Sequence, residues 1–170
     1  MKTSAAKPHA TSAKTSPRPL VGWREWLALP QLGVEVIKAK VDTGAKTSAL
    51  HAEELEVLRG EEGDRVRFRV HVREGDGVLG ELLEFPLLDE REIRSSNGQI
   101  ELRPIIRTEL RLGDTIWHAE VTLTTREHMG FNMLLGRSAL KHHFWVDPGR
   151  SFLQSPAVTE STPDDEPTTP

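Results

Sequence analysis

Polar and apolar residues alternate along much of the chain, which is the pattern of strands with one buried face. The alternation is continuous over Arg65–Val72 and over Trp117–Thr124, and it extends with one residue out of phase over Ile100–Leu112. Shorter segments at Val34–Val41 and Leu79–Phe85 also have strand-like patterns. A period of two residues is typical of half-buried antiparallel strands. The pattern therefore predicts a mostly β domain.

Turn signals separate these segments, and long helical periodicity is nearly absent. Gly75–Gly77 predicts a hairpin loop, and Ser96–Gly98 predicts a second, in which Asn97-Gly98 forms a two-residue type I′ turn. A short helix is expected near residues 136–141, and one or two further helical turns between His51 and Arg59. Many short strands must bury a face and protect their edges, which favours a closed barrel or a sandwich.

Both ends of the chain differ in composition from this alternating region. Residues 1–19 consist largely of Ala, Ser, Thr, Lys and Pro, and residues 155–170 consist largely of Pro, Thr, Ser and acids. Neither stretch has enough large apolar side chains to offset the entropy lost on ordering. We therefore expect disordered tails at 1–19 and 155–170, and one domain at 20–154.

Charge and composition exclude several classes of site. The chain has 22 basic and 26 acidic residues, a formal charge of −4, and no cysteine. The charge gives no sign of nucleic-acid binding, and without cysteine there is no disulfide, thiolate metal site or cysteine nucleophile. No run of about 18 apolar residues predicts a membrane span, and the N-terminus lacks the apolar block of a signal peptide. We expect a cytoplasmic protein without nucleic-acid or membrane partners.

The candidate chemistry lies where the strand at Val34–Val41 leads into Asp42-Thr43-Gly44. One interpretation is an Asx turn, in which the Asp42 carboxylate accepts hydrogen bonds from backbone N–H groups near Gly44. The other is a catalytic carboxylate. Small residues follow the turn, an Asn-Gly hairpin comes later, and an apolar-apolar-Gly-Arg segment, Leu134–Arg137, leads into the predicted short helix.

These segments together resemble the retropepsin-like aspartic peptidases. In that family a strand delivers Asp-Thr-Gly-Ala to the site, a hairpin flap closes over the substrate, and an apolar-apolar-Gly-Arg strand passes behind the catalytic loop. The matching segments are Asp42–Ala45, the flap candidate Ser95–Gly98 and Leu134–Arg137. A narrower resemblance rests on Val41–His51, Arg94–Gly98 and Arg103-Pro104. It is to the bacterial family that carries the label "ATP-dependent zinc protease", some members of which accompany an ATP-grasp ligase that adds glutamates to a ribosomal protein.

The resemblance implies a retropepsin-like closed β-barrel with one short C-terminal helix, and an aspartic endopeptidase activity. Such an enzyme needs two carboxyls that share a proton, one to activate water and one to protonate the carbonyl oxygen. The sequence has a single Asp-Thr-Gly, so the second Asp42 has to come from a second copy related by a two-fold axis. The expected partners are a peptide or protein substrate, a second copy, and an ATP-grasp glutamate ligase.

The residues expected at the site fall into three groups. The catalytic group is Asp42, Thr43 and Gly44; the substrate-binding group is Ala45, Lys46, Arg94, Ser95, Ser96, Asn97, Gly98 and Arg103; the supporting group is Leu135, Gly136 and Arg137. The cations of the flap suit an acidic, glutamate-rich peptide. Lys46 stands where retroviral enzymes tend to carry an acid. A cation there favours the ionised form of the two Asp42 carboxyls. The pair then needs a lower pH to take up its proton, or the two acids hold a metal instead.

The zinc label has no counterpart among the sequence motifs. His-Glu-x-x-His does not occur, and His71 and His118 fall on the polar side of their predicted strands, as surface residues do. We therefore assign no metal ligand and expect no cofactor, while a zinc-dependent peptidase stays an alternative. A second alternative is a non-catalytic peptide-binding or dimerisation module on the same barrel. No Walker A motif is present, so any requirement for ATP has to act through a partner.

Overall fold

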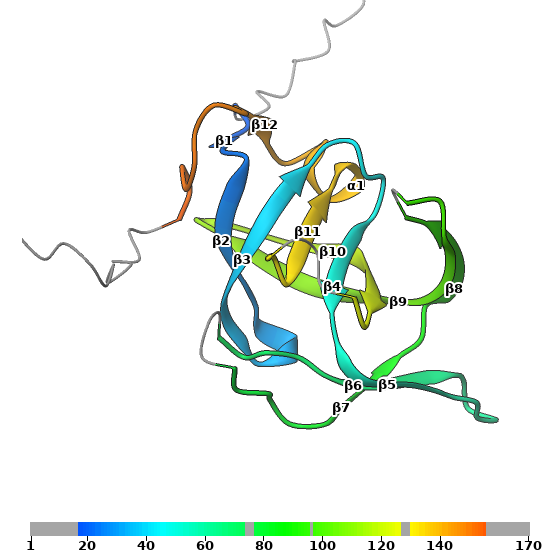
Figure 1. Cartoon of the computed structure of the whole chain (residues 1–170). Coiled ribbons are helices and arrows are strands. Elements are labelled where there is room, and N and C mark those ends of the chain that lie inside the picture. The colour runs from blue at the N-terminus through cyan, green and yellow to red at the C-terminus, as the bar shows by residue number, and fades with distance from the viewer. Residues whose placement is uncertain (1–16, 74–76, 96, 127–129, 156–170) are drawn as a thin grey trace, which may run out of the picture.

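The computed structural model describes residues 17–73, 77–95, 97–126 and 130–155, and its centre is a closed β-barrel (Figure 1). The barrel order is β10-β4-β11-β3-β2-β9, and pairing between β9 and β10 closes it. Its strands are β2 (Arg24–Leu29), β3 (Val34–Asp42), β4 (Ser48–His51), β9 (Ile100–Leu112), β10 (Thr115–Thr124) and β11 (Met133–Gly136). The predicted mostly β, retropepsin-like closed barrel is confirmed.

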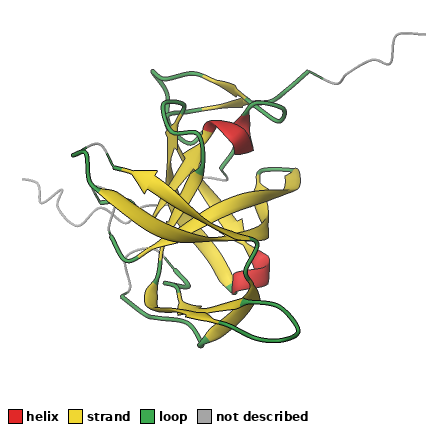
Figure 2. Cartoon of the chain, turned by 90° about the vertical axis from the view of Figure 1, so that its right-hand side faces the viewer, coloured by secondary structure: helices red, strands yellow, loops and turns green. Residues whose placement is uncertain are grey.

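The remaining elements pack around the barrel. A three-stranded sheet, β5-β6-β7, lies below the barrel in both views (Figure 1, Figure 2). Strand β8 extends β9 as a hairpin, β1 pairs in parallel with β12, and the predicted short helix α1 follows β11 directly. The bounds are β1 (Leu20–Val21), a 3-10 turn at Pro30–Leu32, β5 (Glu53–Leu58), β6 (Arg65–Arg69), β7 (Leu83–Pro86), β8 (Asp89–Arg94), α1 (Arg137–Leu140) and β12 (Trp145–Val146).

The inward positions of the barrel strands form the core that the alternation predicts. Large side chains from β3, β4, β9, β10 and β11 are fully or almost fully buried, and they belong to one cluster: Ile37, Leu50, Ile106, Leu110, Leu123, Met133 and Leu135. Burial on this scale supplies most of the driving force for folding, because each large aliphatic side chain contributes about 1.5–3 kcal/mol. The packed core fixes the strand ends that carry the candidate chemistry.

Strands β3, β9 and β10 begin and end within about two residues of their predicted bounds. Strands β6 and β7 are shorter than predicted, because the backbone after Arg69 pairs irregularly. The Gly80 N–H donates to the Val70 carbonyl (2.8 Å), and the Glu35 N–H donates to the Val72 carbonyl (3.1 Å). The predicted loop Gly75–Gly77 falls mostly outside the described residues, as do most of the predicted tails 1–19 and 155–170.

The prediction of helical turns between His51 and Arg59 is wrong. This segment is the end of β4 followed by β5, and Glu54 at a φ of 52° marks the irregular start of the second strand. The N–H groups of His51 and Ala52 donate to the carbonyls of Asn132 and Thr124, each at 2.8 Å. Pairing with neighbouring segments therefore overrides the local helical preference.

The predicted hairpin between β8 and β9 is present, but the type I′ turn is wrong. Ser95 pairs with Gln99 through a 2.8 Å bond, and the Gly98 N–H donates to the Ser95 carbonyl (2.9 Å). Gly98 has a φ of 83°, but three residues separate the paired Ser95 and Gln99, whereas a type I′ hairpin turn has two central residues. Ser96 lies outside the described residues.

No helix in the described part of the chain is long and apolar enough to cross a membrane.

Candidate active site

The candidate site lies where three barrel strands meet at one end of the barrel. Strand β3 ends at Asp42, which is paired in parallel register with Gly136 at the end of β11. Strand β4 starts beside them, and the Gly136 N–H donates a hydrogen bond to the hydroxyl of its first residue, Ser48 (3.0 Å). Asp42 therefore projects from the rim of a packed barrel, where two neighbouring strands fix its backbone.

The Asp42 side chain forms the Asx turn that the sequence allowed. Its Oδ1 accepts hydrogen bonds from the N–H groups of Gly44 (3.1 Å) and Ala45 (3.2 Å). No hydrogen bond to Oδ2 occurs within the described residues. The turn thus orients the carboxylate and leaves one oxygen for a ligand, so the Asx-turn and catalytic interpretations are compatible.

The segment after β11 holds the Asp42 loop from behind. The N–H groups of Arg137 and Ser138 donate to the carbonyls of Ala45 (2.8 Å) and Lys46 (3.0 Å), and the Arg137 guanidinium donates to the Thr43 carbonyl (3.0 Å). A Cβ at Gly136 would lie 2.5 Å from the carbonyl carbon of Thr47. The expected supporting residues Gly136 and Arg137 are therefore placed against the loop, and only glycine leaves room for it.

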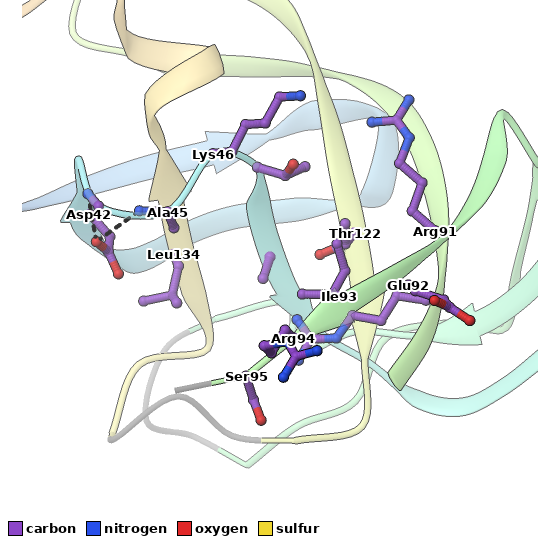
Figure 3. Close-up of a pocket in the computed structure, with 14 residues that line it drawn as sticks. Asp42, Ala45, Lys46, Arg91, Glu92, Ile93, Arg94, Ser95, Thr122 and Leu134 are labelled. Carbon is purple, nitrogen blue, oxygen red and sulfur yellow. Dashed lines mark hydrogen bonds between the residues drawn. The ribbon is translucent and has the colours of Figure 1, made fainter. Parts of the chain in front are cut away.

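A cleft of about 630 Å³ separates the Asp42 loop from the β8–β9 hairpin (Figure 3). Lys46 and Arg91 lie toward one end of it, and Arg94 and Ser95 lie toward the other, with Asp42 at the side (Figure 3). Of the expected site residues, the cleft is lined by Asp42, Gly44, Ala45, Lys46, Arg94, Ser95 and Arg103. Thr43, Asn97, Gly98, Leu135, Gly136 and Arg137 do not line it.

The family model described as "Retropepsin-like aspartic endopeptidase RimB" matches residues 20–157, the whole barrel and its surrounding strands. The chain belongs to the RimB-like family.

Curated relatives of this RimB-like chain carry the name "Probable alpha-L-glutamate ligase". The protein from Shewanella halifaxensis is 42% identical over 133 residues, which cover 78% of this chain and 29% of that protein. The protein from Parasynechococcus marenigrum is 43% identical over 129 residues, which cover 76% of this chain and 28% of that protein. The chain therefore spans less than a third of the length of these relatives.

A solved structure also has the fold of this RimB-like chain. It is the Legionella pneumophila protein Lpg0085, described as of unknown function (DUF785), with a TM-score of 0.66 and 26% identity. The match covers 80% of this chain and 98% of that one.

Several residues that line the cleft were not assigned to the site from the sequence, although Thr47, Ala49 and Leu134 lie in segments that carry the resemblance. Arg91, Glu92 and Ile93 come from β8, and Thr47, Ala49, Thr122 and Leu134 come from the barrel rim. The β8 residues had a local signal, since the polar flank of the Asn-Gly hairpin begins there. Thr122 had none, because it meets Ala49 only through the parallel pairing of β4 and β10, which are far apart in the chain.

The cationic residues around the cleft differ in how far they are neutralised. Arg91 bonds Asp89 (2.9 Å) and Glu120 (3.0 Å), and these hydrogen bonds raise the pKa of its guanidinium. Arg103 is buried and bonds Glu101 at 2.9 Å. Within the described residues Lys46 and Arg94 make no ion pair. They are the two cations of the cleft that are free to contact an anionic ligand.

We predict that Gly136→Ala destabilises the RimB-like domain by about 1–3 kcal/mol, because the added methyl group overlaps the backbone of residues 47–48. Urea unfolding measures this loss. Gly149→Ala is the matched control, since its Cβ would meet only the Asp147 carboxylate at 3.4 Å, and it should change stability by less than about 0.5 kcal/mol. Equal stability of the two variants would contradict the close approach at Gly136.

Proposed function

We propose that this RimB-like domain acts as a homodimeric aspartic endopeptidase, with one Asp42 carboxyl supplied by each copy. The observation that carries the proposal is the placement of Asp42 on the cleft, with Oδ1 fixed by the loop and Oδ2 without a partner in the described residues. The family to which the chain belongs is described as aspartic endopeptidases, which supports the same reaction.

The proposed chemistry requires two carboxyls that share one proton. The ionised carboxyl takes a proton from water, whose oxygen attacks the peptide carbonyl carbon, while the protonated carboxyl donates to the carbonyl oxygen. The roles then reverse, a proton reaches the peptide nitrogen, and the carbon–nitrogen bond breaks. One chain contributes a single Asp42 to this scheme, so the second copy completes the site.

The substrate class follows from the charges of the cleft. Lys46 and Arg94, which make no ion pair within the described residues, lie toward opposite ends of the cleft, and Arg103 contributes a third, partly neutralised cation. Charge-assisted hydrogen bonds to carboxylates are about twice as strong as neutral ones, so such a cleft suits an acidic peptide. The curated relatives, named as probable alpha-L-glutamate ligases, support a glutamate-rich substrate and a glutamate ligase as functional partner.

The hairpin beside the cleft also exposes apolar side chains that a partner could cover. On β9, Ile100 is 56% exposed and Leu102 is 60% exposed. Exposed apolar residues next to a charged cleft are typical of surfaces that bind another chain. We assign this surface to contact with the second copy or with the bound peptide.

We predict that Asp42→Asn lowers peptide turnover by about 100- to 10,000-fold or more, because the amide cannot accept the proton of the attacking water. Hydrolysis of glutamate-rich and unbiased peptide libraries measures the loss. The amide oxygen can still accept the bonds from Gly44 and Ala45, so the unfolding temperature should change little. Full activity in this variant would refute the proposal, and peptide binding without turnover by the wild type would favour the non-catalytic module.

We predict that Arg94→Gln lowers kcat/KM for glutamate-rich peptides by about 10- to 100-fold, the effect of one lost charge-assisted hydrogen bond. Cleavage of neutral peptides should change far less. Arg111→Gln is the matched control, because Arg111 is an exposed arginine of β9 that does not line the cleft. Equal losses on acidic and neutral peptides would contradict a role of Arg94 in substrate charge selection.

A further inference from the structure

A second chemical site lies outside the cleft, where the barrel meets the three-stranded sheet. His51 ends β4, Glu53 begins β5, and His71 follows β6. One ligand atom from each side chain can be chosen so that all three lie within 4.8 Å of one another. The His51 Nε2 is 3.1 Å from Glu53 Oε1, and the two imidazole rings are nearly parallel, with centroids 5.9 Å apart. We propose that these three residues bind a zinc ion that has a structural role.

The first support is the state of His51 without a bound ion. Its side chain is only 5% exposed, and its Nδ1 is buried without a hydrogen-bond partner in the described part of the chain. Buried polar atoms in proteins are nearly always paired, and an exception usually marks a place for a water molecule or an ion. A cation bound at Nδ1 would pair this atom while Nε2 keeps its contact with Glu53, which accounts for an imidazole at this depth.

The second support is geometric. Zinc binds imidazole nitrogen and carboxylate oxygen at about 2.0–2.2 Å, so tetrahedral ligand atoms lie about 3.3 Å apart. Closing a separation of up to 4.8 Å to this value needs only small side-chain rotations. The same bond lengths place two imidazole centroids about 5.2 Å apart at a tetrahedral angle. The observed separation of 5.9 Å is close to that value.

The third support is the donor set and its access. Two imidazoles and a carboxylate are ligands that zinc accepts, whereas magnesium and calcium prefer oxygen alone. Glu53 is 47% exposed and His71 is half-buried, so an ion can reach His51 from solvent. The half-buried position of His71 beside the His51 ring differs from the expectation that His71 is an ordinary surface residue.

The position of the group in the fold argues for a structural role. Ser48, at the start of β4, contacts Gly136 beside Asp42, whereas His51 lies three residues further along the same strand, about 10 Å away. None of the three side chains lines the Asp42 cleft. His51 belongs to the barrel, whereas Glu53 and His71 belong to or adjoin the three-stranded sheet. An ion held by all three therefore ties the sheet to the barrel.

The test uses the full chain without a purification tag, after its metal has been removed with a chelator. Adding Zn²⁺ should give one bound ion per chain by calorimetric titration and a rise of several degrees in the unfolding temperature. Bound Co²⁺ in place of zinc should give the intense visible absorption of a tetrahedral site. The wild type should show all three signals.

Variants assign the ion to this group. His71→Ala should weaken Zn²⁺ binding by about 100-fold and abolish the rise in unfolding temperature, since even the loss of an outer-shell partner costs about 10- to 100-fold. Glu53→Gln should weaken Zn²⁺ binding less than His71→Ala does, because the glutamine amide keeps an oxygen ligand, although a poorer one than the carboxylate. His142→Ala, an exposed histidine after α1, is the matched control and should leave binding unchanged.

Three outcomes would overturn the inference. The first is no Zn²⁺ binding or stabilisation in the wild type, and the second is equal weakening by His71→Ala and His142→Ala. The third is loss of peptide turnover on chelation while the protein stays folded, which would make the metal catalytic. The binding and unfolding measurements do not depend on hydrolysis, so they remain informative even if Asp42→Asn shows that the domain is not a peptidase.

Discussion

The contact between Gly136 and the backbone of residues 47–48 is the constraint on which the rest of the site depends. Because Gly136 has no side chain, β11 can lie directly against both β3 and β4. The turn that follows then reaches the carbonyls of Ala45 and Lys46. The loop that carries Asp42 is thereby fixed by backbone hydrogen bonds, which hold a carboxylate more firmly than mobile side chains do. The barrel core supplies the stability that this arrangement requires.

The same barrel end also organises the cleft. Strand β9 starts in the outer hairpin with β8 and then closes the barrel against β10, so one long strand links the core to the wall that faces Asp42. Positive charges on that wall and Lys46 on the loop face the space between them. The opposite end of β4 carries His51, one of the three residues of the proposed zinc site. The two ends of β4 therefore lie at two different proposed sites, the catalytic cleft and the zinc site, which share no residue.

Much of the fold could be predicted from local pattern. Continuous or nearly continuous alternation identified β9 and β10, and a shorter strand-like pattern identified β3, because inward positions of these strands pack on the core. Alternation also identified β6 and β7 but predicted both to be longer, because the ladder breaks after Arg69 and backbone groups there bond to distant segments. It failed for the segment after His51, whose strand conformation is imposed by carbonyls of other strands.

The residues of the candidate site also divide into those that local motifs predicted and those that depend on contacts between distant strands. The loop at Asp42 and the segment at Gly136 were predicted because short motifs encode tight turns and close backbone approach, and Arg94, Ser95 and Arg103 followed from the hairpin beside them. Thr122 was missed because it becomes a neighbour of Ala49 only through pairing between distant strands. The approach of His51 and His71 was missed for a related reason, since the irregular register of β5 and β6 brings the two rings together.

The most direct test of the central claim is a subunit-mixing titration. Wild-type chain at fixed concentration is mixed with increasing Asp42→Asn chain, and hydrolysis of a glutamate-rich peptide is followed while light scattering reports the dimer. If two Asp42 carboxyls form one site, mixed dimers are inactive, and activity per wild-type chain falls to about half at equal amounts. Activity per wild-type chain that stays constant at every ratio would contradict a site shared between two copies.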